Sequence, residues 1–180
     1  MKKIVITGGP CSGKTTIIEE LRKKGFPILE ETAKEIVEKR RDFPFTEEEA
    51  KIRQNLIFNE QLRKEELAEK QNYETLLLDR SIIDGLAYVN LYCNENYKKE
   101  FSEKIKNTDY DLILLFELLP FESEGFRSKN ENVEEARKIH DSLYNSYKGL
   151  GYNIIIVPKM SVEERINFVL EKINLLQNFV

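Results

Sequence analysis

The sequence predicts an α/β fold in which helices cover both faces of a mostly parallel, five-stranded sheet. Five short apolar runs stand out, and most are continuous rather than alternating, as strands buried on both faces require. The longer stretches between these runs have the pattern of helices, so strands and helices alternate along the chain. A length of 180 residues suits one domain of this kind. The expected strands are 4–7, 26–29, 75–78, 112–116 and 154–157.

The first helix is expected at residues 13–24, between the first two strands. Ile17 and Leu21 supply its apolar face, and Gly25 suits the left-handed conformation that often ends a helix. Pro27 cannot donate a backbone hydrogen bond to a neighbouring strand. The second strand is therefore expected at an edge of the sheet, or to begin at this proline.

Two further helices are predicted by capping boxes, in which a hydroxyl and a carboxylate three residues apart satisfy the free amides of a helix start. Thr46 with Glu49 begins a long helix that ends near residue 70, and Ser161 with Glu164 begins the C-terminal helix. The apolar residues after Ser161 fall on one helical face, which predicts that this helix packs against the sheet. They are Val162, Ile166, Val169, Leu170 and Ile173.

Composition and charge exclude several classes of protein. Hydrophobic residues make up 41% of the chain and charged residues 33%, which suits a globular core and is too apolar for general disorder. The 28 basic and 32 acidic side chains give a net charge of −4, which does not favour a nucleic-acid partner. Two cysteines, Cys11 and Cys93, are too few for a disulfide framework and favour a reducing compartment. Neither a signal peptide nor a membrane span is indicated, so we expect a cytoplasmic protein with no membrane partner.

A phosphate-binding motif is the strongest functional signal. Residues 8–15 read Gly-Gly-Pro-Cys-Ser-Gly-Lys-Thr, which satisfies G-x-x-x-x-G-K-S/T between an apolar strand and an amphipathic helix. Glycines let the backbone wrap closely around a polyphosphate with its amides turned inward. Lys14 is expected to neutralise phosphate oxygens, and Thr15 to offer its hydroxyl to Mg²⁺. The residues expected to bind the nucleotide are Gly8, Gly9, Pro10, Cys11, Ser12, Gly13, Lys14, Thr15 and Thr16.

The end of the third strand supplies a candidate metal ligand. Asp79 places a carboxylate at the carboxyl edge of the sheet, where open α/β folds bind their ligands. We expect it to hold Mg²⁺ or the water shell of Mg²⁺, the alternative being a cap on the following helix. The sequence contains no Asn-Lys-x-Asp segment of the kind that reads guanine, which disfavours a GTP switch but leaves the preference among purine triphosphates open.

Three segments together match the pattern of a known family. Residues 6–16 read Ile-Thr-Gly-Gly-Pro-Cys-Ser-Gly-Lys-Thr-Thr, residues 31–36 read Glu-Thr-Ala-Lys-Glu-Ile, and residues 79–88 read Asp-Arg-Ser-Ile-Ile-Asp-Gly-Leu-Ala-Tyr. They resemble the NadR-like AAA domain family, a branch of the P-loop kinases related to ribosylnicotinamide, deoxynucleoside and thymidylate kinases. With similar segments at 125–127, 147–152 and 157–165, the resemblance covers nearly the whole chain.

The resemblance implies a three-layer P-loop kinase-like fold with strand order 2-3-1-4-5, and roles on the acceptor side. Glu31 matches the family's acidic position after the second strand, from which related kinases present a general base to the acceptor hydroxyl. Glu30 is the adjacent alternative, and either residue is also typical of an ordinary first helical turn. Arg80 resembles the arginine that related kinases direct at the acceptor, the alternative being a surface ion pair. Lys34 departs from the arginine common in the family, so it keeps the charge but loses bidentate geometry.

Residues 121–141 form a charged stretch of the kind that P-loop kinases use as a lid. Arg127 and Arg137 are expected to close over the γ-phosphate and supply charge in the transition state, and Arg127 matches the family pattern better. For both, a solvated helix face is the alternative. His140, the only histidine, receives no role.

The long helix carries Gln54, Phe58 and Gln61 on one face. In related kinases the corresponding helix lines the acceptor pocket, so one interpretation is ring stacking on Phe58 and a hydrogen bond from Gln61. The other interpretation is half-buried packing.

These features predict a Mg-ATP-dependent kinase that transfers the γ-phosphoryl group to a small nucleoside- or nucleotide-like acceptor. The alternative is a nucleotide-binding regulatory ATPase module that acts on a protein partner. A polynucleotide 5′-kinase would need a basic groove, which the acidic chain does not indicate. The sequence leaves a homodimer open and does not identify the acceptor. The expected catalytic residues are Lys14, Glu31, Asp79, Arg80, Arg127 and Arg137.

Overall fold

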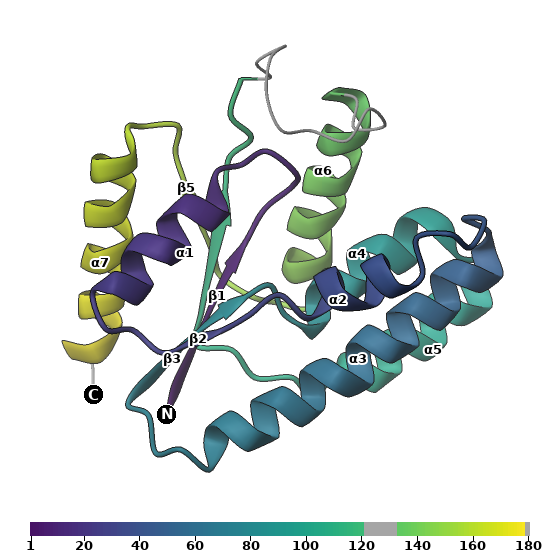
Figure 1. Cartoon of the computed structure of the whole chain (residues 1–180), viewed down its shortest axis with the longest axis horizontal. Coiled ribbons are helices and arrows are strands. Elements are labelled where there is room, and N and C mark those ends of the chain that lie inside the picture. Colours follow the sequence, from purple (N-terminus) through teal and green to yellow (C-terminus); the bar gives the residue numbers. More distant parts are fainter. Residues whose placement is uncertain (121–132, 179–180) are drawn as a thin grey trace.

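The computed structural model describes residues 1–120 and 133–178 and contains a five-stranded parallel sheet between two layers of helices (Figure 1). The order of the strands is β2-β3-β1-β4-β5, and each neighbouring pair is parallel. The fold class and the strand order expected from the sequence are confirmed. The strands are β1 (Lys2–Thr7), β2 (Ile28–Leu29), β3 (Thr75–Asp79), β4 (Leu112–Phe116) and β5 (Ile154–Val157).

The helices divide between the two faces of the sheet. In Figure 1, α1 (Lys14–Lys23) and α7 (Val162–Asn178) lie together on one side. The other side carries α2 (Thr32–Lys39), α3 (Glu47–Glu69), α4 (Ile82–Tyr92), α5 (Glu95–Ile105) and α6 (Val133–Gly149).

The central strand β1 contributes side chains to the core on both sides of the sheet, because successive side chains point to opposite faces. Ile4 and Ile6 pack in the cluster that includes residues of α1 and α7, whereas Val5 packs in the cluster with residues of α3, α4 and α5. All three are fully buried, with 0% exposure. Burial on both faces explains why these runs are continuously apolar.

The helices begin and end near the capping residues predicted from the sequence, with two local differences, at Glu49 and Val162. Gly25 has φ +92° just beyond α1, and the Thr46 hydroxyl accepts a hydrogen bond from the Glu49 amide at 3.1 Å. The Glu49 carboxylate, however, accepts hydrogen bonds from Arg40 and Arg53, so only half of that capping box forms. The Ser161 box forms in both directions. Val162, expected on the packed face of α7, is 48% exposed.

The second strand is shorter than expected. Only Ile28 and Leu29 are assigned to β2, although the Pro27 carbonyl still accepts a hydrogen bond from the Leu77 amide at 3.0 Å. The strand lies at the edge of the sheet, as the proline predicts.

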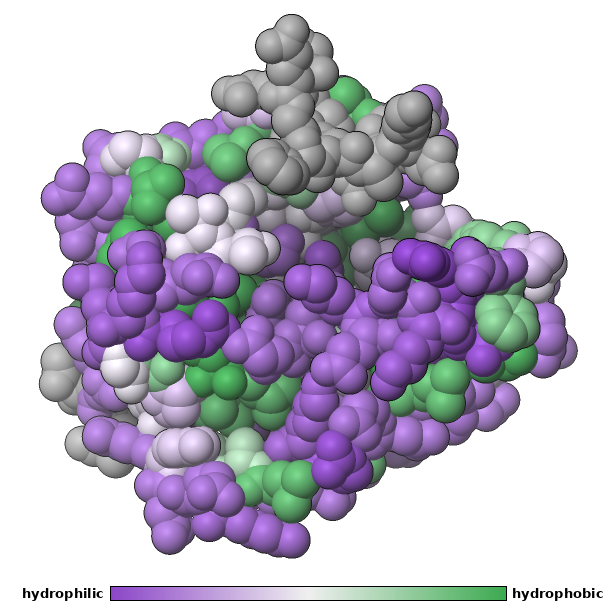
Figure 2. Space-filling view, viewed as in Figure 1, coloured by the Kyte–Doolittle hydropathy of each residue, from purple (hydrophilic) through white to green (hydrophobic). Residues whose placement is uncertain are grey.

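The surface agrees with the hydrophilic composition. Figure 2 shows hydrophilic side chains over most of the face in view, with apolar residues in separate small patches. None of the helices within residues 1–120 and 133–178 is long and apolar enough to cross a membrane.

Candidate functional site

The loop between β1 and α1 has backbone conformations that demand glycine. Gly8 has φ +149°, and a Cβ at this position would lie 2.7 Å from the Phe116 carbonyl oxygen. Gly13 has φ +78° and forms the N-cap of α1. Cys11 also adopts a left-handed conformation, with φ +62°, which costs a non-glycine residue about 1 kcal/mol or more. The motif thus folds as a tight loop that opens directly onto a helix N-terminus.

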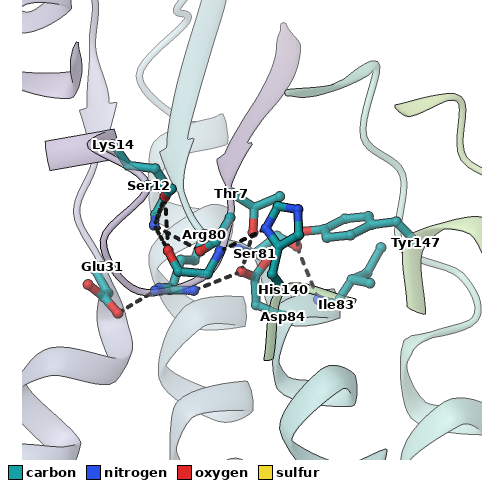
Figure 3. A network of polar contacts seen from close by, with 12 residues as sticks. Thr7, Ser12, Lys14, Glu31, Arg80, Ser81, Ile83, Asp84, His140 and Tyr147 are labelled. Atoms are coloured by element: carbon teal, nitrogen blue, oxygen red, sulfur yellow. Dashed lines mark hydrogen bonds and ion pairs between the residues drawn. The ribbon is translucent and has the colours of Figure 1, made fainter. Parts of the chain in front are cut away.

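Lys14 is buried at the start of α1, where it folds back over the loop (Figure 3). Its Nζ donates to the Gly8 carbonyl at 2.8 Å, the Gly9 carbonyl at 3.1 Å and the Ser12 hydroxyl at 2.9 Å. Burial lowers the pKa of Lys14, and the nearby charge of Arg80 lowers it further. A buried cation held only by neutral oxygens fits an anion, because a phosphate would compensate the charge that these dipoles leave exposed.

Thr15 and Asp79 line the same cavity as Lys14, from the start of α1 and the end of β3. Burial raises the pKa of Asp79, and the negative charge of Glu31 raises it further. A hydroxyl and a carboxylate are the hard oxygen donors that Mg²⁺ uses, and Mg²⁺ usually keeps further waters and phosphate oxygens. The described part of the chain contains no cluster of three or more metal-binding side chains. The donor set therefore suits a magnesium ion held jointly by protein and nucleotide. Thr16, also expected to bind nucleotide, is exposed and does not line the cavity.

The cavity extends well beyond the phosphate loop and has a volume of about 1040 Å³. One end is lined by Pro10, Cys11, Lys14, Thr15 and Asp79, and the other mainly by residues of α2, α3 and α4. Of the other residues expected to bind the nucleotide, Gly8, Gly9, Ser12 and Gly13 belong to the loop but do not line the cavity. A space of this size holds a second small molecule beside a nucleotide. The residues at the far end include Val37, Phe45, Arg53, Gln54, Tyr88 and Tyr92.

Glu31 and Arg80 meet between the two ends of the cavity (Figure 3). The Arg80 Nε donates to Glu31 Oε1 at 2.7 Å, although the two residues lie in different loops. Arg80 has φ +69°, a strained conformation that turns its side chain into the site. Glu30, the alternative to Glu31, is exposed and pairs with Arg22, so it does not line the cavity.

A buried carboxylate that received no role from the sequence holds Arg80 from the other side. Asp84 is 3% exposed and accepts hydrogen bonds from Arg80 Nη1 at 3.3 Å, the Thr7 hydroxyl at 2.6 Å and the Ser81 amide at 3.1 Å. Arg80 and Thr7 donate to Oδ1, whereas the Tyr147 hydroxyl of α6 donates to Oδ2, the oxygen that the Ser81 amide also binds. The signal in the sequence is the capping box of Ser81 with Asp84, which forms fully at the start of α4.

The three residues of α3 that the sequence places on one face, Gln54, Phe58 and Gln61, have different surroundings. Gln54 and Gln61 line the cavity, whereas Phe58 packs in the core, with its ring centroid 6.0 Å from that of Phe101. The Thr32 hydroxyl donates to the Gln61 side chain. Gln54 is 8% exposed, and its Oε1 is the one buried side-chain polar atom in the described residues that has no hydrogen-bond partner. Packing is thus the correct interpretation for Phe58, whereas the Gln54 oxygen is buried beside Gly85.

The expected lid falls largely outside the described residues, and Arg127 lies there. Arg137 is exposed on α6 and does not line the cavity. The turn of α6 that contains Ala136 packs closely on the phosphate loop. A Cβ added to Gly9 would lie only 2.9 Å from the Ala136 carbonyl oxygen. His140 Nδ1 accepts a hydrogen bond from the Gly9 amide at 3.4 Å, and burial lowers the pKa of His140. No pattern in the sequence predicts this contact, since it depends on how α6 packs against the loop.

The sequence matches a family model described as AAA domain over residues 3–165, which include the phosphate loop, Glu31 and the Asp79–Asp84 segment. The chain belongs to this family. A search of curated proteins finds no match.

Solved structures show which fold this AAA domain has. A deoxyadenosine kinase from M. mycoides, with the products dCMP and dCDP bound, superposes with a TM-score of 0.70 at 18% identity, and the match covers 96% of this chain and 98% of that one. Thymidylate kinase from Candida albicans gives a TM-score of 0.71 at 16% identity, covering 98% and 92%. A NadR protein in complex with NAD and AMP-PNP gives 0.67 at 21% identity, and the match covers 94% of this chain but 49% of that one. The AAA domain therefore has the fold of P-loop nucleoside and nucleotide kinases.

Proposed function

We propose that this AAA domain is a Mg-ATP-dependent kinase that transfers the γ-phosphoryl group to a small nucleoside- or nucleotide-like acceptor. The observation that carries the proposal is one continuous cavity that joins the phosphate loop to a second compartment lined by α2, α3 and α4. A module that only binds and hydrolyses a nucleotide needs the first compartment alone. The second compartment is lined by the side chains of Gln54 and Gln61, polar groups of the kind that fix the orientation of a small molecule.

The charges around the acceptor position favour a hydroxyl over a phosphate. Arg80 is already bound by the carboxylates of Glu31 and Asp84, and Arg53 is bound by Glu49. Lys34, the other cation lining this part of the cavity, is exposed. Within residues 1–120 and 133–178, an acceptor phosphate would therefore meet the Glu31 carboxylate without a free buried cation to offset the repulsion.

The chain's own residues can support each part of the transfer. Lys14 and the loop amides hold the phosphates, and Thr15 and Asp79 would hold Mg²⁺, which supplies charge stabilisation to the transferred group. Glu31 lies where it can orient an acceptor hydroxyl and take its proton late in a loose transition state. Arg80 donates a hydrogen bond to Glu31 and so holds that carboxylate at the cavity wall.

The test is ADP release from Mg-ATP by the full chain, alone and with a panel of nucleosides, nucleoside monophosphates and ribosylnicotinamide. Products are identified by mass, since phosphorylation adds about 80 Da. The proposal predicts one class of acceptor that stimulates ADP release and gains one phosphate, with nucleosides preferred over their monophosphates. Slow hydrolysis that no acceptor stimulates would contradict it and favour the regulatory ATPase.

A further inference from the structure

Arg165 is a buried cation directly behind the phosphate loop. It lies in the first turn of α7 and is 2% exposed. Its guanidinium donates to three backbone carbonyls from three different loops. Nη1 donates to Ser12 O at 2.6 Å, Nε to Pro158 O at 2.8 Å, and Nη2 to Glu117 O at 3.4 Å.

The charge of Arg165 has no counterion in contact. Within the described residues it forms no salt bridge, and its contacts are carbonyl dipoles and the Phe116 ring, whose centroid lies 5.5 Å away. The negative charge of Glu117 acts on it from a greater distance, but burial outweighs that effect and lowers the pKa of Arg165. It also sits near the N-terminus of α7, where the helix dipole disfavours a cation. Burying an unpaired charge is costly, so its retention at this place points to an anion that joins the site.

The hydrogen bond to Ser12 also determines how the loop presents its next amide. The chain contains no cis peptide bond in the part that is described, and in a trans peptide the C=O and the following N–H point in opposite directions. With the Ser12 carbonyl turned back onto Arg165, the Gly13 N–H points away from Arg165. Gly13 caps α1, so its amide belongs to the free helix-end donors that bind phosphate.

The approach of the guanidinium depends on Gly13 itself. A Cβ at Gly13 would lie 3.1 Å from Arg165 Nη1, tighter than ordinary contact. The motif glycine and Arg165, more than 150 positions later in the sequence, therefore fit together as one unit.

We propose that Arg165 is a positioning residue for polyphosphate binding, which orients the Ser12–Gly13 peptide and places a buried positive charge behind the loop. It acts through the loop and does not line the cavity. The inference rests on the nucleotide half of the proposed function and is independent of the acceptor.

The experiment measures the affinity of the full chain for ADP and for inorganic tripolyphosphate by calorimetry, with no acceptor present. R165M should weaken both by about 10- to 100-fold, the value of a charge-assisted hydrogen bond. R165K retains the charge and one donor arm and should recover part of the loss, whereas R165Q retains a donor without the charge and should recover less. R22M, which removes an exposed arginine from α1, is the matched control and should bind both ligands as the wild type does.

A purely structural role predicts a different pattern. In that case R165M would lower the melting temperature of the ligand-free protein while the surviving folded fraction bound ADP within about threefold of the wild type, and this result would overturn the proposal. If R165M fails to fold, R165K and R165Q decide, and wild-type affinity in both would overturn it equally. If the wild type binds ADP and tripolyphosphate but phosphorylates no acceptor, the kinase proposal is contradicted, whereas the positioning role of Arg165 is still tested by the variants.

Discussion

The two ends of the cavity are built in opposite ways. The phosphate end comes mainly from one continuous loop, residues 8–15, which Asp79 joins from the end of β3, and its backbone amides take their direction from glycine conformations. The acceptor end is assembled from side chains of several segments, held by one hydrogen-bond network around Arg80 and Asp84. Backbone donors serve any polyphosphate, whereas a network of side chains can be reshaped for a particular acceptor. Changes at the first end should therefore affect every reaction of the site, and changes at the second only transfer.

The largest effect is expected from Lys14→Ala. This variant removes the buried cation at the phosphates, so ADP release with and without acceptor should fall by about 10³-fold or more. Steady-state ADP release is the measurement, and Lys24→Ala, at the exposed end of α1, is the control. A variant that kept a tenth of the wild-type rate would show that Lys14 does not serve the nucleotide.

Glu31→Gln should separate the two ends. The amide has the shape of the carboxylate but cannot take a proton, so acceptor phosphorylation should fall by about 10²-fold or more. The dissociation constant for ADP should stay near the wild-type value because Glu31 lies beyond the phosphate loop. Glu30→Gln is the control at the next position, since Glu30 pairs with Arg22 outside the cavity. Equal losses in the two variants would contradict the assignment of Glu31.

The same contrast explains what the sequence could predict. Every residue of the phosphate loop is adjacent to the next, so spacing alone predicts the motif, and continuous apolar runs predict the buried strands around it. The strand order and fold class followed from this and from the family resemblance, and the structure confirms both.

The contacts of Asp84, Tyr147 and Arg165 could not be predicted in this way. Tyr147 reaches Asp84 across 63 positions, and Arg165 reaches Ser12 across 153. Arg165 binds carbonyl oxygens, which every residue carries, so no pattern of side chains indicates its partners. Phe58 and Gln61 show the same limit of prediction within one helix. Helical spacing predicts that they share a face, but not that Phe58 packs in the core while Gln61 lines the cavity.

Tyr147→Phe tests whether the network matters for the acceptor. Loss of one buried hydroxyl should cost about 1 kcal/mol in the free energy of unfolding and leave Asp84 with a weaker hold on Arg80. The KM for the acceptor should rise several-fold, while the KM for ATP stays unchanged. Urea denaturation and steady-state kinetics measure the two effects. Tyr144→Phe, one turn earlier on α6, should change neither.

The smallest expected effect is a shift in the pH dependence of magnesium-dependent ADP binding. It would show that charges at the two ends of the cavity influence each other. Burial and the charge of Glu31 raise the pKa of Asp79, and only the ionised carboxylate can hold Mg²⁺. As pH falls through this raised pKa, Asp79 takes up a proton, so the magnesium-dependent part of ADP binding is lost at a higher pH than for an ordinary carboxyl group. Glu31→Gln removes the neighbouring negative charge and frees Arg80 to stabilise the Asp79 carboxylate. The acid limb of binding should therefore move to lower pH, by about one unit at most.

Calorimetry measures the affinity for ADP with and without Mg²⁺ across this pH range, and so gives the pH at which the magnesium-dependent affinity is lost. It involves no phosphoryl transfer, so the loss of activity in Glu31→Gln does not interfere. Glu30→Gln should leave the limb in place, because Glu30 is paired with Arg22 and does not contribute to the pKa of Asp79. A limb that stays fixed in Glu31→Gln would mean that the charges of the two ends act independently. The acceptor carboxylate could then be exchanged without retuning the metal site, and the two ends would be separable in function as they are in construction.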